Sequence, residues 1–171
     1  MQRRQILKWL GIASIPPILF GVWNTRSNSA ANVSELEQRK EEWKNILLPE
    51  RYQILFEEQT EPAGSSPLTD EKREGIYICA ACFLPLFSSD AKFDSGTGWP
   101  SFYQPIDASH ISTKDDYKLL YKRIEYHCHR CGGHQGHVFN DGPEPTGKRY
   151  CNNGLALRFV PSEQDLPSLR G

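Results

Sequence analysis

The sequence has no surplus of charge of either sign. Its 171 residues contain 20 Lys and Arg and 21 Asp and Glu, which leaves a formal net charge of -1. Proteins that bind nucleic acid need clustered Lys and Arg to neutralise phosphates, so we expect no nucleic-acid partner. The chain also lacks an uncharged apolar run of about 18 residues after residue 30, and we therefore predict no membrane-spanning helix in that part. The length suits one domain with a hydrophobic core.

Residues 1–31 differ in composition from the rest of the chain. They include Arg3 and Arg4, then a short apolar stretch that contains Pro16 and Pro17, and they end in the small residues of "SNSAAN". This layout is typical of a secretory signal, and the paired arginines are similar to those of a twin-arginine signal, which directs folded proteins to export. We predict a signal peptide that sends the protein to the periplasm or an equivalent lumen. The alternative is an uncleaved membrane anchor that faces the same compartment.

Residues 32–171 are expected to form a single catalytic domain. Apolar residues at helical spacing predict one short helix that begins near Ser34 and a second that begins at Pro49. From Gly75 onward, short apolar pieces alternate with Gly and Pro clusters, which is typical of small antiparallel sheets. The fold class is therefore mainly β with short N-terminal helices. The polar residues 162–171 are expected to form a loose tail.

The chain has no sixth cysteine, so its five thiols cannot all pair. Four of them form two C-x-x-C units, "CAAC" and "CHRC", in which a tight turn lets two sulfurs converge on one ion. Two such units complete a tetrahedral site, and four protein ligands make its Zn²⁺ structural, one per chain. The candidate metal ligands are Cys79, Cys82, Cys128 and Cys131. Two disulfides or a redox-active C-x-x-C remain as alternatives, and His127 or His129 could replace a thiolate.

The fifth cysteine, Cys151, lies apart from both units. A single buried cysteine is usually a small hydrophobic residue, and that interpretation stays open. In an extended strand, however, Arg149, Cys151 and Asn153 share one face, and a neighbouring Arg lowers the pKa of a thiol. Upstream, His134 and His137 in "HQGH" are candidate proton donors or orienting residues.

Trp99 lies in a glycine-rich loop, "DSGTGWPSF". A tryptophan on such a loop either packs in the core or forms an exposed aromatic wall for an apolar ligand.

Two segments around these residues resemble the type B methionine sulfoxide reductases, which act on the R epimer. They are "GIYICAACFLPLFSSDAKFDSGTGWPSF" and "CHRCGGHQGHVFNDGPEPTGKRYCNNGLALRF", and the likeness runs from about Leu48 to Phe159. The resemblance implies small antiparallel sheets with helices on the N-terminal side. It also implies an enzyme that reduces methionine R-sulfoxide in oxidised proteins through a sulfenic acid on Cys151. The expected partners are those oxidised proteins and a thioredoxin-like reductant, and we expect a monomer.

The resemblance also assigns roles by position. It makes Cys151 the nucleophile and Trp99 the wall that packs on the sulfoxide methyl. It places two histidines near the sulfoxide oxygen, and we expect His137 rather than His134 to protonate it. The residues that support or line the site are Asn153, Arg149, Asp141 and Phe139. The four paired cysteines match the zinc ligands of the metal-containing subgroup.

The chain departs from the family pattern at three positions. Asn152 and Gly154 replace an aliphatic residue and a serine, and Thr97 stands where many members carry a second, resolving cysteine. We therefore expect an external dithiol to reduce the Cys151 sulfenic acid directly. Two alternatives come from other functional classes: a zinc-ribbon binding module without catalysis, and an exported C-x-x-C disulfide oxidoreductase.

Overall fold

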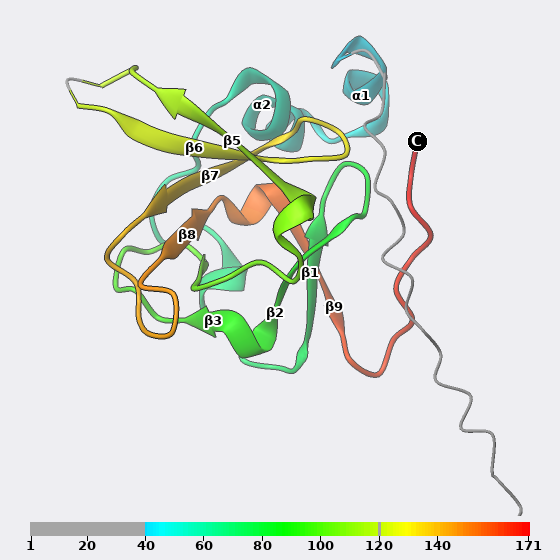
Figure 1. The fold of residues 1–171 in the computed structure, drawn as a ribbon. Helices are drawn as coiled ribbons and strands as arrows, with labels where there is room; N and C mark the ends of the chain where they lie inside the picture. Colours follow the sequence, from blue (N-terminus) through cyan, green and yellow to red (C-terminus); the bar gives the residue numbers. More distant parts are fainter. Residues whose placement is uncertain (1–39, 120) are drawn as a thin grey trace, which may run out of the picture. The chain divides into compact units, whose positions relative to one another are not determined.

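The structure, a computed structural model, describes residues 40–119 and 121–171. The predicted signal peptide or anchor, residues 1–31, and the predicted helix start at Ser34 lie outside these residues. Across the two described ranges, no helix is long and apolar enough to cross a membrane. The fold class predicted from the sequence, mainly β with short N-terminal helices, is confirmed (Figure 1).

Two short helices precede the sheets, α1 (Lys40–Ile46) and α2 (Pro49–Glu57). Pro49 begins α2 as the sequence predicts, because its fixed φ suits the first helical turn and its missing N–H needs no partner there. Trp43 is fully buried and stacks on Phe56 with ring centroids 5.8 Å apart. This contact packs α1 against α2.

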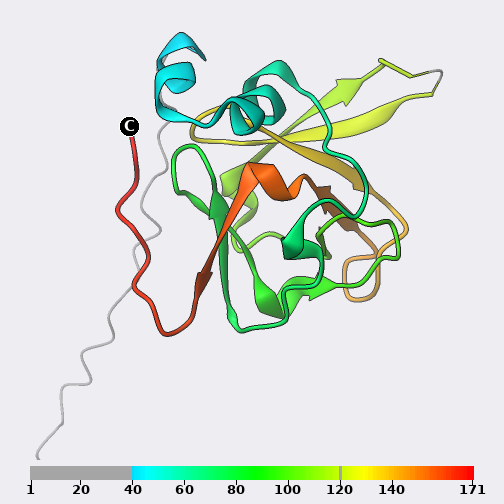
Figure 2. The same cartoon turned by 180° about the vertical axis from the view of Figure 1, so that it is seen from behind.

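The strands of the described residues form two antiparallel sheets. The smaller sheet has the order β2-β1-β9, and the larger has the order β3-β4-β8-β7-β6-β5. The strands are β1 (Gly75–Cys79), β2 (Pro85–Ser88), β3 (Lys92–Phe93), β4 (Ser101–Phe102), β5 (Ile111–Asp116), β6 (Arg123–Cys128), β7 (His134–Phe139), β8 (Arg149–Asn152) and β9 (Leu157–Pro161). Single-turn 3-10 helices lie in the connections: η1 (Pro67–Thr69) before β1, and η2 (Ser89–Ala91), η3 (Ala108–His110) and η4 (Gly154–Ala156) between strands. The long connection from α2 to β1 passes beside η4 (Figure 2).

Aromatic side chains from both sheets form the core between them. Phe87 of β2 stacks on Phe102 of β4 with centroids 4.4 Å apart, and Tyr77 of β1 meets the Phe102 ring edge-on at 4.9 Å. Tyr126 of β6 contacts Phe87 and Tyr150 edge-on. Such rings bury large apolar areas in preferred geometries, so this cluster holds the small sheet against the large one.

The two C-x-x-C units form equivalent turns, one in each sheet. The first connects β1 to β2, and the second connects β6 to β7. In both turns the residue after the second cysteine is left-handed, with φ of 66° at Phe83 and 70° at Gly132. In both, the N–H of that residue donates to the carbonyl of the first cysteine, Cys79 or Cys128. Each sheet therefore presents one pair of sulfurs from the same kind of turn.

Residues 162–171 contain no helix or strand, but hydrogen bonds attach their end to both turns. The Arg170 guanidinium donates to two carbonyl oxygens of the "CAAC" turn, at 2.6 and 2.7 Å, and lies over the Phe83 ring at 4.2 Å. Arg130 of the "CHRC" turn donates to the Arg170 carbonyl oxygen at 2.6 Å. The end of the segment expected to be a tail thus lies next to the four cysteines.

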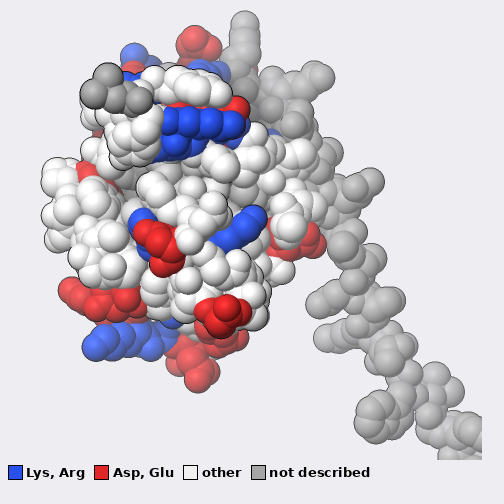
Figure 3. Space-filling view, turned by 60° about the vertical axis from the view of Figure 1, so that its left-hand side comes forward, with Lys and Arg blue, Asp and Glu red and all other residues white. Residues whose placement is uncertain are grey.

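Charged side chains of both signs are mixed on the surface. On the face shown in Figure 3, Lys and Arg lie close to Asp and Glu, and large uncharged areas separate these groups. Lys114 and Lys118 both contact Glu58, at 2.5 and 2.6 Å, and Lys122 contacts Asp115 at 2.9 Å. Binding to phosphates requires unopposed positive charge, and this face offers no extended region of that kind.

Candidate active site

Cys151 lies at a small pocket on the larger sheet. Its strand, β8, lies between β4 and β7, so its register neighbours are Ser101 on one side and His137 on the other. The pocket has a volume of about 120 Å³, below the range of about 300–1,000 Å³ for sites that enclose whole ligands. It therefore has room for the end of one side chain. Its lining residues are Thr60, Trp99, Arg123, Gly136, His137, Phe139, Cys151, Asn152 and Asn153.

Gly136 allows β7 to approach β8 closely beside Cys151. A Cβ atom at this position would lie 1.9 Å from the Cys151 carbonyl oxygen, which is backbone and cannot move aside. Only glycine fits there. In the sequence "HQGH", Gly136 is therefore required by the close contact between β7 and β8, and it separates His134 from His137.

Glu61 connects the segments that carry Trp99 and Cys151. Its carbonyl oxygen accepts a hydrogen bond from the Trp99 indole N–H at 3.1 Å, and its own N–H donates to Asn153 Oδ1 at 3.1 Å. Its buried carboxylate accepts hydrogen bonds from two backbone N–H groups of η4, at 2.5 and 3.0 Å. One buried residue therefore fixes the indole relative to the chain that follows β8.

Asp116 and Arg123 position His137. His137 Nε2 lies 2.7 Å from Asp116 Oδ2, and Arg123 donates to the same oxygen at 2.6 Å. A hydrogen bond from the Lys118 N–H, followed by those from His137 and Arg123, holds the pKa of the Asp116 carboxyl well below its usual range. Asp116 is therefore ionised and accepts the Nε2 proton.

Burial lowers the pKa of His137 below its ordinary value, although Asp116 opposes this shift. The resting imidazole is therefore neutral at neutral pH. Because its single proton lies on Nε2 against a carboxylate, Nδ1 is free to accept a proton.

His134 lies behind the pocket instead of lining it. Its side chain is 1% exposed, and its Nδ1 lies 2.5 Å from Glu125 Oε1. The Asn153 amide nitrogen lies 3.4 Å from His134 Nε2, so that nitrogen accepts and Nδ1 carries the proton. Burial lowers the pKa of His134 to about 4, so the ring is neutral at neutral pH. The resemblance implies that this histidine lies near the sulfoxide oxygen, and in the structure its Nε2 contacts the Asn153 side chain.

Arg149 is held in a bidentate ion pair beside the pocket. Its guanidinium donates to both carboxylate oxygens of Asp141, at 2.9 and 2.8 Å. It also lies over the Phe139 ring at 4.3 Å. Since Phe139 forms part of the pocket wall, Asp141 and Arg149 together support that wall.

The pKa of the Cys151 thiol is raised above its ordinary value. Burial is the largest cause, and Arg149 and Thr97 only partly oppose it. Arg149 does lower the pKa of this thiol, as the sequence predicts, but burial outweighs its effect in the resting site. Desolvation acts on the thiolate directly, whereas the Arg149 charge is already paired with Asp141. Cys151 is therefore a protonated thiol at neutral pH.

A chain of hydroxyl groups leads to Cys151. Thr97 Oγ1 lies 4.0 Å from Cys151 Sγ, and Ser95 Oγ lies 2.8 Å from both Thr97 Oγ1 and Ser101 Oγ. Thr97 thus occupies the position next to the sulfur where the resemblance implies a second thiol in many family members.

The four paired cysteines converge as their spacing predicts. All are free thiols, and their sulfurs approach between units, with Cys79 3.6 Å from Cys131 and Cys82 3.5 Å from Cys128. These distances far exceed a disulfide bond of about 2.05 Å. They are close to the separation of about 3.8 Å expected for sulfurs around a tetrahedral zinc with Zn–S bonds of about 2.3 Å. The buried Gln135 amide donates to Cys79 Sγ at 3.6 Å, as outer hydrogen bonds to thiolate ligands do.

The neighbouring histidines do not join this cluster. His129 Nδ1 contacts Ser112 Oγ, and His127 points to Glu125. Glu125, His127 and His134 form a second group whose ligand atoms lie within 4.8 Å of one another. The 2.5 Å contact between Glu125 and His134 is shorter than the separation of about 3.3 Å between nitrogen and oxygen ligands of one tetrahedral ion. We therefore interpret it as a direct contact between the two side chains and not as a pair of metal ligands.

Four residues of the site carry no motif in the sequence: Glu61, Asp116, Arg123 and Glu125. Glu61 lies in a segment that composition assigns to a loop. Asp116 and Arg123 face each other across the β5–β6 hairpin, a pairing that is visible only once the register is known. Glu125 occupies an inward position in "RIEYHC", and a charge at such a position does indicate a buried partner.

Known proteins are similar to this chain over most of its length. Residues 47–161 match a family model described as SelR domain. The chain is 51% identical over 130 residues to the peptide methionine sulfoxide reductase MsrB of Methanosarcina mazei, covering 76% of this chain and 93% of that protein. It is 49% identical over 125 residues to the MsrB of Leptospira interrogans, with 73% and 95% covered. It is 45% identical over 151 residues to peptide methionine sulfoxide reductase B1, chloroplastic, of Arabidopsis thaliana, with 88% and 72% covered.

Replacing Asp141 by Asn is expected to lower the pKa of Cys151, because it removes the carboxylate that pairs with Arg149. Alkylation of Cys151 by iodoacetamide should then be about three- to tenfold faster at neutral pH, which corresponds to a pKa shift of up to about one unit. Mass spectrometry of the Cys151 peptide across the neutral and alkaline range measures this rate. Asp165→Asn, on the exposed C-terminal segment, is the control. An unchanged or slower rate in Asp141→Asn would contradict the electrostatic account.

Replacing Glu61 by Gln should destabilise the fold by about 1–3 kcal/mol, because an amide cannot accept as strongly from both N–H groups of η4. Urea unfolding monitored by circular dichroism measures the change. The exposed Glu163→Gln should change stability by less than about 0.5 kcal/mol. Equal midpoints for Glu61→Gln and the wild type would mean that these hydrogen bonds do not hold the site together.

Proposed function

The chain belongs to the family of type B peptide methionine sulfoxide reductases, and on that premise we propose that Cys151 is the nucleophile that reduces the R epimer of methionine sulfoxide in oxidised proteins. One observation carries this assignment. Four of the five cysteines gather in one cluster, and the fifth lies in a side-chain-sized pocket with Trp99 and His137. This arrangement pairs a thiol with an aromatic wall and a base.

The first step moves the thiol proton. Cys151 and His137 are register partners on neighbouring strands, where side chains lie on the same face with Cβ atoms about 4.5–5.5 Å apart. His137 Nδ1 accepts the proton, and the resulting imidazolium is stabilised by ionised Asp116 at Nε2. The raised pKa of Cys151 and the lowered pKa of His137 keep the pair neutral until substrate displaces water from the pocket.

The second step transfers oxygen. The Cys151 thiolate attacks the sulfoxide sulfur while the imidazolium returns the proton to the sulfoxide oxygen. The hydroxyl then moves from the substrate sulfur to Cys151 Sγ while the sulfur–sulfur bond formed by the attack breaks. The thioether leaves, and Cys151 is a sulfenic acid. The methionine sulfur gains two electrons and the cysteine sulfur loses two, so the step needs no further reagent.

The selection of the epimer comes from the two unlike walls of the pocket. The sulfoxide sulfur is chiral. It carries a methyl group, which favours an apolar contact, and an oxygen, which needs a proton donor. Trp99, fixed by Glu61, offers an apolar face to the methyl, and His137 offers a proton to the oxygen. Exchange of the two groups in the other epimer would set the oxygen against the indole.

Regeneration is assigned to an external dithiol of thioredoxin-like character. Thr97 lies beside Cys151 where a resolving thiol would be required, and the remaining cysteines lie in the cluster. One thiol of the reductant attacks the sulfenic acid and releases water, and its second thiol then frees Cys151 while the reductant becomes a disulfide.

The four-cysteine cluster is proposed to bind one structural Zn²⁺ per chain. The sulfur separations and the hydrogen bond from Gln135 fit four thiolate ligands. A closed coordination sphere leaves no position for substrate, so the metal would stabilise the fold and take no part in oxygen transfer. The protein is proposed to act as a monomer.

The proposed location is an exported compartment. Residues 1–31 would act as a twin-arginine-like signal, or alternatively as an anchor facing that compartment. Folding before export would let the thiols bind zinc under reducing conditions, before they reach a compartment where disulfides form.

The two rival functions account for fewer of these features. A zinc-ribbon binding module explains the cluster but not the pocket at Cys151. A C-x-x-C oxidoreductase needs a disulfide within one unit, whereas the close sulfur contacts here run between units.

The wild-type protein should reduce the R epimer of a methionine sulfoxide peptide with dithiothreitol as reductant and leave the S epimer unchanged. Chromatography of the two separate epimers measures both rates. Cys151→Ser should lose all turnover, because serine is a far weaker nucleophile, and should keep its circular dichroism spectrum. Appreciable turnover by Cys151→Ser would remove Cys151 from the proposed role.

Loss of one cluster thiol should release the metal and destabilise the fold. Cys82→Ser is expected to retain well below one zinc per chain and to unfold at least about 10 °C lower, because structural zinc contributes directly to folding free energy. Elemental analysis and thermal unfolding measure the two effects. Cys151→Ser, with an intact cluster, is the matched control and should keep one zinc. Full zinc content in Cys82→Ser would argue against a four-thiolate site.

A further inference from the structure

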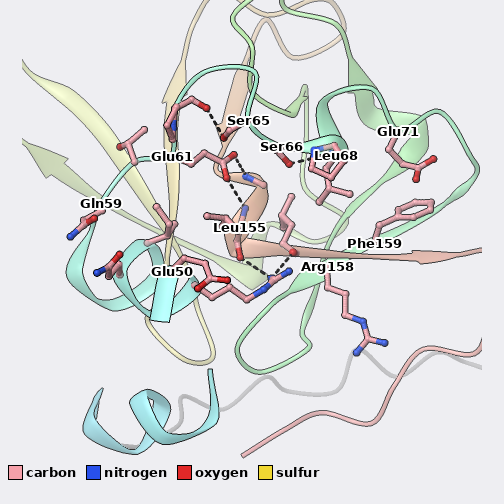
Figure 4. A pocket seen from close by; sticks show the side chains of 18 of the residues that line it. Glu50, Gln59, Glu61, Ser65, Ser66, Leu68, Glu71, Leu155, Arg158 and Phe159 are labelled. Atoms are coloured by element: carbon pink, nitrogen blue, oxygen red, sulfur yellow. Dashed lines mark hydrogen bonds between the residues drawn. The ribbon is translucent and has the colours of Figure 1, made fainter. Parts of the chain in front are cut away.

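A larger cavity borders the Cys151 pocket. It has a volume of about 920 Å³ and lies between α2, the connection from α2 to β1, and the chain from η4 to β9 (Figure 4). Thr60 lines both this cavity and the Cys151 pocket. The two hollows are therefore neighbours on one surface, and a polypeptide could extend from one into the other.

The cavity contains the free edge of a sheet. β9 is the outer strand of the order β2-β1-β9. The Ala156 carbonyl and the Ser162 N–H form hydrogen bonds to the β1 side, to Ala80 and Glu74. Residues two apart in an antiparallel strand direct both backbone groups to the same side, so the even-numbered positions of this segment point towards β1.

The odd-numbered positions of β9 therefore point outward. The Leu157 carbonyl confirms this direction, because it accepts a hydrogen bond from Arg51 at 2.9 Å. The N–H and C=O of Phe159 point the same way, towards the cavity that Phe159 lines. Within the described part of the chain, no hydrogen bond reaches these two groups. An N–H and a C=O without partners on an edge strand are a template for an added strand.

The side chains around the β9 edge are of mixed chemical character, so they select no particular sequence in a bound peptide. Leu68, Leu155 and Phe159 supply apolar contacts, and Glu71 and Arg158 supply charges of opposite sign (Figure 4). Recognition that relies on main-chain hydrogen bonds, with shallow contacts to side chains, tolerates varied sequences. That tolerance fits a substrate defined by one oxidised side chain within any protein.

We propose that this cavity is a polypeptide subsite, in which the main chain next to the oxidised methionine pairs with the free edge of β9. The inference rests on the proposed function and extends it to the rest of the substrate. The pocket of about 120 Å³ holds only the sulfoxide end of the side chain. The attached chain must lie on the adjoining surface, and this cavity adjoins it at Thr60.

The test compares three R-sulfoxide substrates: a single residue blocked at both ends, an extended peptide, and the same peptide with alternate backbone nitrogens methylated. Methylation removes N–H donors and blocks strand pairing. With the full-length protein, the extended peptide should have a kcat/KM at least about tenfold above the blocked residue, equivalent to about 1.4 kcal/mol. The methylated peptide should lose that advantage.

A variant pair tests the cavity itself. Ser65 is exposed and lines the cavity, so Ser65→Trp would fill part of it. The ratio of kcat/KM between the extended peptide and the blocked residue should fall several-fold. Ser168→Trp makes the same change at an exposed position outside the cavity and should leave the ratio unchanged. Circular dichroism confirms that both variants fold.

The outcomes separate this inference from the proposed function. The subsite is overturned if neither backbone methylation nor Ser65→Trp lowers kcat/KM for the extended peptide relative to the blocked residue. The same result is expected if residues 1–39 of the chain fill the cavity, and it overturns the subsite in that case too. If no sulfoxide is reduced at all, the proposed function fails. Calorimetric titration with the extended peptide then decides the subsite alone, because weaker binding by Ser65→Trp supports it and equal or absent binding overturns it.

Discussion

Convergence of four sulfurs from two sheets is the constraint on which the rest of the structure depends. The cluster joins the turn between β1 and β2 to the turn between β6 and β7. The chain that carries Cys151 leaves the larger sheet at β8 and enters the smaller sheet at β9, so its path requires the two sheets to be fixed relative to each other. The aromatic core supplies part of this restraint. A metal bound by both turns would supply a restraint that relaxes only when a ligand bond breaks.

The electrostatics of the pocket follow from charges that are already paired. Arg149 is bound by Asp141, and Asp116 is bound by Arg123. Desolvation therefore dominates at Cys151, and the resting thiol keeps its proton. Such a site protects its nucleophile from oxidants in solution, since the thiolate is the reactive form. In the proposed mechanism, reactivity depends on transfer of the proton to His137 when substrate fills the pocket. Asp116 lies where it would stabilise the charged imidazole.

The sequence predicts the parts of this protein that depend on local chemistry. Paired C-x-x-C spacing and Pro49 at a helix start are local patterns, and the structure places both as expected. The alternation around Cys151 holds only to Asn152, because β8 ends there and Asn153 precedes η4. The positions of His134 and Glu61 depend instead on strand register and on a long loop that returns to η4. Both are buried polar residues whose partners are distant in sequence, and no periodicity encodes them. The direction of the Cys151 pKa shift could not be predicted from the sequence either, because it depends on the burial of the thiol and on the pairing of Arg149 with Asp141.

A repair enzyme has to recognise one modified atom within many different sequences. The two hollows divide that task by size and by chemistry. We propose that the small pocket discriminates by its shape and by offering different contacts to a methyl group and to an oxygen, both of which belong to the sulfoxide alone. The edge of β9 offers an N–H and a C=O, which every polypeptide can match. Selectivity for the sulfoxide is therefore compatible with tolerance of varied flanking sequences, because the two forms of recognition use different atoms of the same substrate. The required extended backbone in turn implies that oxidised methionines in flexible or unfolded segments are better substrates than those in helices.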